Sequence, residues 1–146
     1  MSILSQLLNK NGEKIDPINH NYESRLQKLE NNIYSTSEVK TGQNWINDKP
    51  IYRKCFVIDK DDTSSSSITI ETGIQNLELI TNIRGLLLRT EGTMMNIPNG
   101  LITNTDWLLW FGDLTATQIK VKMGASAYGI MSKVYVVLEY TKTTDS

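Results

Sequence analysis

Apolar side chains recur at helical spacing over residues 21–33. Tyr22, Leu26, Leu29 and Ile33 follow one another at steps of four, three and four residues, which is the a/d spacing of a coiled-coil seam. A single helix of about 13 residues is barely stable in water. The spacing therefore predicts a short helix that needs partner helices, with these four residues as its oligomerisation contacts. A helix that folds back onto its own domain is the alternative, although the seam is narrower than the apolar face such a helix usually has.

The first 20 residues follow another pattern. Gly12 and Pro17 interrupt any helix, and the apolar residues gather near the beginning, at Ile3, Leu4, Leu7 and Leu8. This pattern predicts an extended arm with one short apolar anchor.

After Tyr34 the pattern becomes typical of β-structure. Thr, Val, Ile, Tyr and Trp occur in short runs that Gly, Asn, Asp and Ser interrupt, as strands and their turns do. Many short strands with turn signals between them favour an antiparallel sandwich or barrel. We predict strands at residues 35–40, 44–46, 51–59, 67–72, 78–89, 106–112, 117–123 and 130–142.

Two of these strands differ in how they alternate. In residues 118–123, QIKVKM, apolar and polar residues alternate, so one face is expected to be solvated. In residues 130–142 both faces are apolar, because Tyr135 and Val137 lie opposite the face that carries Val136. A strand that is apolar on both faces belongs in the middle of a sandwich or at a contact between subunits.

Two polar stretches are predicted to be loops. Residues 59–67, DKDDTSSSS, are expected to form an exposed hairpin loop. Residues 94–106 include Pro98 and Gly100 and are expected to form a longer loop, and binding sites are often placed on such loops.

Residues 44–54, NWINDKPIYRK, are interpreted as a structural hairpin. Asn47 and Asp48 both tolerate the left-handed conformation, so a type I′ turn is possible between the two strands. We expect Trp45 and Tyr52 to pack across this hairpin as an aromatic pair.

Length and charge narrow the classes of function. A chain of 146 residues can bury one good core. Fifteen basic residues against sixteen acidic ones give a net charge of -1, so no overall field would hold the protein to nucleic acid or to an anionic membrane. The longest apolar run is far shorter than a membrane span, and no signal peptide is expected at the N-terminus. We therefore predict no nucleic-acid partner and no membrane insertion.

Candidate catalytic and metal-binding residues are scarce. His20 and Cys55 are the only histidine and the only cysteine, too few for a zinc site, and neither a metal-binding nor a phosphate-binding loop motif occurs. We expect no enzyme activity, no cofactor and no metal. A pair of carboxylates can hydrolyse a glycoside. A polysaccharide-degrading enzyme that uses Asp106 and Asp113 is therefore kept as a less favoured hypothesis.

The aromatic residues suggest a binding surface. Aromatic faces stack on sugars and on cations, so Trp107, Trp110 and Tyr128 are candidate contacts with a glycan. Trp107 and Trp110 are three apart in a predicted strand, so they are expected on opposite faces, one in the core and the other exposed or at an interface. Core packing is the alternative for each ring.

Two stretches resemble bacteriophage fibre and appendage proteins, which include tail fibres, head fibres and neck or baseplate appendages. Residues 41–56, TGQNWINDKPIYRKCF, are similar to a hairpin in that family, although the family often has Asp-Gly where this chain has Asn47 and Asp48. Residues 135–145, YVVLEYTKTTD, are similar to the last strand of the same domain. The resemblance implies a trimeric, jelly-roll-like β-sandwich head on a coiled-coil or fibrous stalk.

The resemblance also implies a division of labour along the chain. Residues 1–20 would dock on the virion through the apolar anchor, residues 21–34 would trimerise, and residues 35–146 would form the sandwich head. The expected role is structural. The protein would be made in the host cytoplasm and incorporated into the virion, as a homotrimer that contacts capsid, portal, neck or tail proteins. A head that binds a host-surface glycan is the alternative function.

Overall fold

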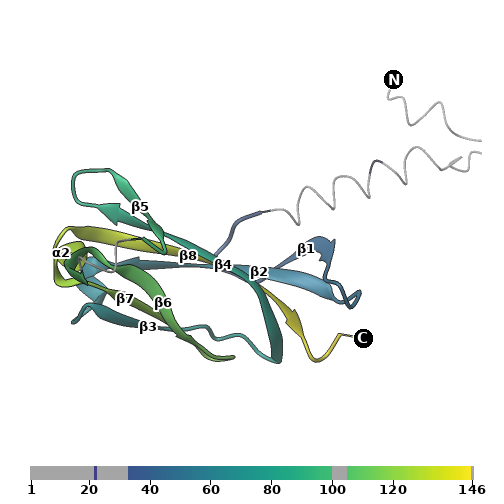
Figure 1. Ribbon diagram of the computed structural model, residues 1–146. Coiled ribbons are helices and arrows are strands. Elements are labelled where there is room, and N and C mark those ends of the chain that lie inside the picture. The colour runs from purple at the N-terminus through teal and green to yellow at the C-terminus, as the bar shows by residue number, and fades with distance from the viewer. Residues whose placement is uncertain (1–21, 23–32, 100–104, 146) are drawn as a thin grey trace, which may run out of the picture.

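The protein is mainly β, with its strands paired in antiparallel sheets. The computed structural model describes residue 22, residues 33–99 and residues 105–145. Within these residues the predicted mainly antiparallel β-fold is confirmed (Figure 1). The strands are β1 (Val39–Asn44), β2 (Pro50–Asp59), β3 (Ser67–Glu71), β4 (Leu77–Arg89), β5 (Met94–Ile97), β6 (Leu109–Leu114), β7 (Gln118–Met123) and β8 (Met131–Lys142).

Two sheets face each other across one core. The larger has the order β1-β2-β8-β4-β5 and the smaller the order β3-β7-β6, and Figure 1 shows them as two layers. Both sheets contribute to a single cluster of buried apolar residues. Its members with no exposed surface are Leu87, Leu109, Ile119, Val121, Ala127, Val134, Val136, Leu138 and Tyr140. The alternation predicted for residues 118–123 is thus observed, with Ile119 and Val121 turned inward.

The connection after β2 differs from the prediction. Residues 59–67 were expected to form a hairpin loop, but β2 and β3 belong to different sheets. The connection instead carries the chain from one layer to the other and contains the short 3-10 helix η2 (Lys60–Asp62). A polar stretch has the same composition in either role, so the sequence did not separate them.

The predicted long loop at residues 94–106 begins with a strand. β5 pairs with β4, and its Met95 and Ile97 are buried while Met94 and Asn96 are exposed. Four residues are short for a strand signal, and Pro98 follows at once, which is why the pattern suggested a loop.

The strand expected at residues 106–112 begins only at Leu109. Before it, residues Thr105–Trp107 form the 3-10 helix η3, and a short helix, α2 (Ala125–Gly129), precedes β8.

The first hairpin turns earlier and differently than expected. Two strands were predicted here, at residues 35–40 and 44–46, but the structure has the single strand β1, Val39–Asn44. The Trp45 amide donates to the Lys49 carbonyl at 2.8 Å. Asp48 has φ 62° and Asn47 has no positive φ, whereas a type I′ turn needs two such residues in a row. The loop is therefore a three-residue hairpin loop.

The predicted pair of Trp45 and Tyr52 is wrong. Tyr52 lies opposite Lys40 across the hairpin, and its ring stacks on Tyr140 of β8 with 6.0 Å between centroids. The aromatic partner comes from a strand 88 positions further along, which local spacing does not reveal.

Several predictions concern residues outside the described part of the chain. These are the arm of residues 1–20 with its anchor at Ile3, Leu4, Leu7 and Leu8, and most of the helix of residues 21–34, including Leu26 and Leu29. Tyr22, which has helical backbone, and Ile33 are described, and they are 58% and 53% exposed. The coiled coil, the jelly-roll topology and the division into three parts remain predictions.

None of the helices in the described residues is long and apolar enough to cross a membrane.

Candidate interaction surface

The side of the five-stranded sheet that faces away from the core is apolar at its centre. Cys55 of β2 lies opposite Val137 of β8, and Val57 lies opposite Tyr135. On the other side of β8, Leu86 of β4 lies opposite Tyr135. Side chains directly opposite on one face of a sheet are in contact range. We call Cys55, Val57, Leu86, Tyr135 and Val137 the outer patch.

The outer patch is accessible, although its residues are apolar. Val57 is 42% exposed, Tyr135 is 38% exposed and Leu86 is 37% exposed. Their neighbours along the strands point the other way, since Leu87, Val134 and Val136 have no exposed surface. Over residues 134–138 β8 is thus apolar on both faces, as predicted, with one face in the core and the other exposed at Tyr135.

Two hollows flank Tyr135 on this face. One, of about 410 Å³, is lined by residues of β4, β5 and β8 that include Leu86, Asn96 and Val137. The other, of about 290 Å³, is lined by β2 and β8 together with the segment at residues 34–36. The surface at the patch is therefore not flat, and side chains of a partner can fit into its two hollows.

A buried charge cluster adjoins the outer patch. Arg53 of β2 and Glu139 of β8 are only 6% and 9% exposed, and Arg53 Nη2 lies 3.3 Å from Glu139 Oε2. The other carboxylate oxygen accepts a hydrogen bond from Asn82 Nδ2 at 3.3 Å and lies 3.7 Å from Arg84 Nη1. Removing one partner of such a pair leaves an uncompensated charge, so the cluster favours the observed register of β2, β8 and β4 over registers that separate these charges.

Tyr34 covers this charge cluster. Its ring lies 4.3 Å from the Arg53 guanidinium carbon, and its hydroxyl accepts a hydrogen bond of 2.6 Å from Arg84 Nη2. One residue later, the Ser35 carbonyl accepts a hydrogen bond from the Cys55 amide at 2.9 Å. Stacking of guanidinium on an aromatic face is favourable. The chain that comes from the predicted helix is therefore fastened beside the outer patch.

The sequence did not point to this cluster, although it contains a signal. Glu139 is a single charge within the apolar run VYVVLEY, and Arg84 interrupts ITNIRGLLL. A lone charge in a buried strand needs a partner, but the partners Arg53 and Glu139 are 86 residues apart, so spacing cannot pair them.

The thiol of Cys55 is free and half-buried. Burial raises its pKa, and the hydrogen bond with the Ser35 backbone is the largest opposing effect. A raised pKa keeps a thiol protonated near neutral pH and weakens it as a nucleophile. Cys55 thus acts as an apolar member of the outer patch.

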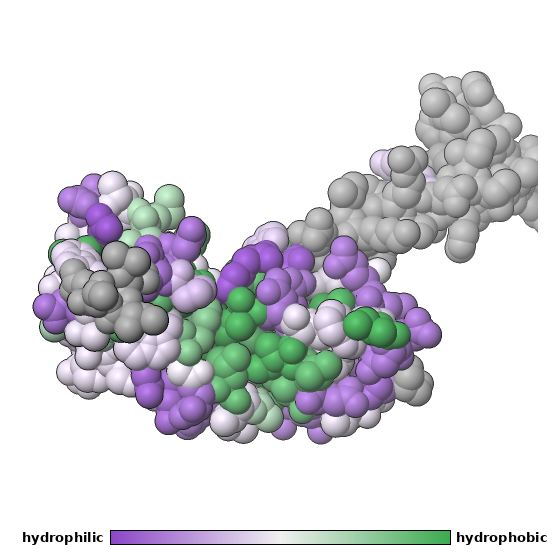
Figure 2. All heavy atoms as spheres, viewed as in Figure 1, coloured by the Kyte–Doolittle hydropathy of each residue, from purple (hydrophilic) through white to green (hydrophobic). Residues whose placement is uncertain are grey.

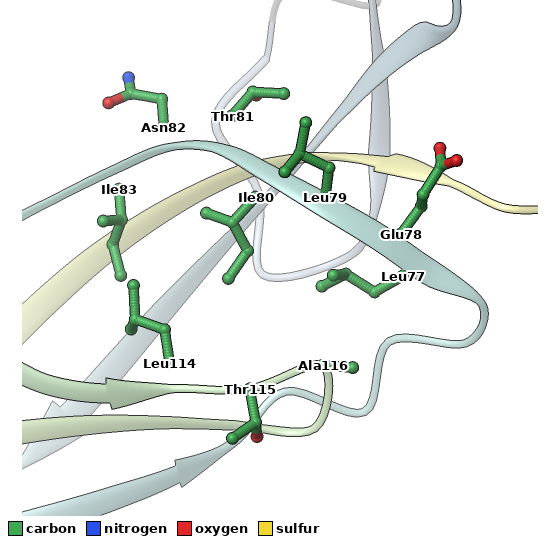
Figure 3. A pocket seen from close by; sticks show the side chains of 10 residues that line it. All are labelled: Leu77, Glu78, Leu79, Ile80, Thr81, Asn82, Ile83, Leu114, Thr115 and Ala116. Carbon is green, nitrogen blue, oxygen red and sulfur yellow. The ribbon is translucent and has the colours of Figure 1, made fainter.

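A second apolar surface lies between the two sheets. We call it the intersheet groove; it has a volume of about 630 Å³ and is bounded by the first half of β4 and by the turn between β6 and β7. Figure 3 shows Leu77, Ile80 and Ile83 pointing toward Leu114. In the view of Figure 2 hydrophobic residues gather in the middle of the molecule. β5 pairs with residues 85–88 of β4 and not with residues 77–83, which line the groove.

The two tryptophans predicted to contact a glycan are both on the surface. Trp107 is 37% exposed and Trp110 is 38% exposed, so the expectation that one lies in the core is wrong. Trp107 belongs to η3 rather than to a strand, and strand alternation therefore does not relate it to Trp110. Trp110 lies in β6 opposite Lys122.

Tyr128, the third candidate glycan contact, is already engaged. The Lys60 ammonium lies 3.6 Å from the centre of its ring, and its hydroxyl lies 3.1 Å from Thr63 Oγ1. Its helix α2 packs against η3, where the Gly124 amide donates to the Leu108 carbonyl at 2.7 Å. A Cβ at Gly124 would come within 2.1 Å of the Thr105 carbonyl oxygen, so only glycine permits this contact. The stacked aromatic pair in the described residues is Tyr52 with Tyr140, and it includes none of these three rings.

The carboxylates considered for hydrolysis are in separate elements. Asp106 lies in η3, whereas Asp113 lies in β6 and pairs with Lys120 at 3.6 Å. No group of three or more His, Cys, Asp or Glu in the described part of the chain could hold a metal ion.

No protein-family model matches this chain, and no curated protein or solved structure is significantly similar to it. The resemblance of residues 41–56 and 135–145 to bacteriophage fibre and appendage proteins therefore remains a prediction.

Proposed function

We propose that the protein is a homotrimeric structural component of a bacteriophage virion: a fibre, an appendage or a decoration protein. In this proposal residues 1–20 dock on the particle, residues 21–34 trimerise, and the two sheets form a jelly-roll-like sandwich that is displayed outward. The observation that carries it is that Tyr34, the last residue of the predicted helix, is held beside a partly exposed apolar patch. The similarity of residues 41–56 and 135–145 to phage proteins supports the virion assignment.

The exposed seam residues favour association. Tyr22 and Ile33 stand at the two ends of the predicted a/d seam and are 58% and 53% exposed. A helix this short is marginal without partners, and identical helices bury such a seam by cyclic symmetry. The resemblance to phage proteins favours three chains over two.

Attachment by such a trimer works through avidity. Once one chain has bound, the other two are held at a high effective concentration near their own sites, so three weak contacts act as a strong one. A structural protein that decorates a particle needs no catalytic residue for this purpose.

The oligomeric state tests the proposal. Native mass measurement of the full chain at micromolar concentration is expected to give three times the mass of one chain. Replacing both Leu26→Asp and Leu29→Asp should shift the protein toward monomer, because carboxylates at seam positions repel one another. The matched control is Ser24→Asp with Asn31→Asp, which by the heptad spacing lie on the outside of the seam. A strictly monomeric wild-type protein would contradict the proposal.

The location on the particle needs a separate experiment. Antibodies against this chain, imaged on purified virions by electron microscopy, should label one fixed structure on the head, neck or tail. Absence of the chain from purified virions would exclude a virion role even if the protein is a trimer.

The exposure of both Trp107 and Trp110 favours a second candidate function, binding of a host-surface glycan. A glycan array probed with the full chain should then give signals that decrease on Trp107→Ala or Trp110→Ala. Trp45→Ala, in the first hairpin, is the control. No signal above background would count against glycan binding and leave the structural role unaffected.

A further inference from the structure

We propose that the outer patch is the surface on which a second copy of this chain packs, so that the contact between copies continues from the helix onto the five-stranded sheet. The inference rests on the proposed homotrimer and identifies which part of the two-sheet unit takes part in it.

The composition of the patch is unusual for a solvated sheet. An antiparallel sheet that faces water on one side carries polar residues there. The three-stranded sheet does so: Lys120 and Lys122 of β7 point outward while Ile119 and Val121 have no exposed surface. A contiguous apolar surface on a soluble domain marks an interaction site.

The surroundings of the patch resemble the rim of a protein interface. At one end, Arg53 and Glu139 lie opposite each other in the strand register and are paired. At the other end, Asp59 and Lys133 lie opposite each other and are 3.2 Å apart. An apolar centre with a charged rim is the usual anatomy of an interface. Both ion pairs at the rim are formed within one chain. A second copy can therefore cover the patch without leaving a buried charge unpaired.

The path of the chain indicates a second copy as the occupant. Ile33 ends the predicted seam, and Tyr34 stacks on Arg53 at the edge of the patch. Residues 34–36 line the same hollow as Val57 and Tyr135. Chains that meet along the seam are therefore brought together next to this face.

Substitutions at the patch test the inference. Val57→Asp with Tyr135→Asp should weaken association of the full chain about tenfold or more, since carboxylates would be buried without partners. The matched control, Thr69→Asp with Trp110→Asp on the outward face of the three-stranded sheet, should leave association unchanged. Because all four positions are exposed, both variants are expected to fold. Circular dichroism and thermal melting check that they do.

The two proposals fail in different ways. If the wild-type protein is a monomer, the proposed trimer is wrong. If it is a trimer that Leu26→Asp with Leu29→Asp dissociates, while the patch variant associates as tightly as wild type, the trimer stands and the inference is wrong.

Photocrosslinking identifies the occupant even if the patch variant fails to fold. Benzoylphenylalanine in place of Tyr135 should crosslink to strands β1–β8 of a second copy, as mapped by mass spectrometry of the crosslinked peptides. The same residue in place of Trp110 should give no such product. Crosslinks confined to residues 1–20, or no crosslink from position 135 in a trimeric preparation, would overturn the inference.

Discussion

The two sheets present opposite chemistry on the faces that they turn away from each other. On the three-stranded sheet, β7 turns Lys120 and Lys122 outward, and across from them on β3 lie Thr69 and Ser67. On the five-stranded sheet, the centre of the outward face is the apolar outer patch. The inward faces, in contrast, are alike: Val121 of β7 and Val136 of β8 both have no exposed surface.

This contrast distinguishes the apolar residues that stabilise the fold of one chain from those that a partner would contact. A two-layer fold is held together by its inward faces, and β7 shows that an outward face can be polar without loss of the core. The apolar residues on the outward face of β8 are therefore not needed for packing within one chain. Their exposure costs solubility, which a protein tolerates when the surface is covered in its working state.

The largest expected effect lies on the inward face of β8. Leu138→Ala should lower the free energy of unfolding by about 4 kcal/mol, because Leu138 has no exposed surface and its loss leaves a cavity. Urea denaturation measures the change. Val137→Ala, one position away on the outward face, should cost less than half as much in protein held monomeric by Leu26→Asp with Leu29→Asp. Equal losses would remove the distinction between the two faces.

The buried charge cluster should give the next largest effect. Glu139→Ala leaves Arg53, which is 6% exposed, without its carboxylate, and should destabilise the protein by about 3 kcal/mol. Thermal melting compares it with Asp113→Ala, which removes the exposed ion pair with Lys120 on the other sheet and should cost under about 1 kcal/mol. Similar losses for the two variants would show that Glu139 is effectively solvated.

Alkaline pH should destabilise the inward face at the Tyr52–Tyr140 stack. Burial, with a hydrogen bond to Asp145 as the next cause, raises the pKa of Tyr52 to about 12, and burial followed by the hydrogen bond to Glu38 raises the pKa of Tyr140. The folded state thus holds its phenolic protons more tightly than the unfolded chain, whose tyrosines have a pKa of about 10.

The stability from these protons is fully present below pH about 10 and is lost as pH rises toward 12. Melting temperatures should be flat up to about pH 9.5 and fall above pH 10, and a phenolate absorbance titration should show delayed ionisation. Tyr52→Phe should reduce the slope. A melting temperature unaffected between pH 10 and 12 would contradict the expected linkage.

The smallest effect is expected on the outward face of the three-stranded sheet. Lys120→Ala should change the free energy of unfolding by no more than about 0.5 kcal/mol, since its partner Asp113 is exposed. Analytical ultracentrifugation should find the oligomeric state unchanged. A shift toward monomer would indicate that the three-stranded sheet, and not the five-stranded sheet, takes part in the subunit contact.

Local alternation predicted most of the strands, and it predicted which faces are buried for some of them. The pattern of residues 118–123 is repeated in the burial of β7, and the apolar character of both faces of residues 130–142 anticipated an uncovered patch. In contrast, β5 is too short to give a pattern of its own, and Trp107 was assigned to a strand because the apolar run after it hides the start of β6.

Contacts between distant residues could not be obtained from spacing. Nothing in a single sequence places β8 between β2 and β4, so neither the outer patch nor the pair of Arg53 and Glu139 could be assembled from it. The glycan candidates illustrate the same limit: Tyr128 is an aromatic residue of suitable type, but Lys60, 68 residues earlier, occupies its ring.

The central position of β8 affects the order in which the molecule can form during synthesis. Among the described residues β8 is the last strand, yet β2 and β4 pair with it and not with each other. When a ribosome has completed β1 to β7, the larger sheet still lacks its middle, and closing it requires contacts of long sequence separation, which form slowly. The predicted helix emerges much earlier. Nascent copies that join there would hold their unfinished sheets side by side, so each β8 could pair with the strands of a neighbour unless its own β2 and β4 bind it first.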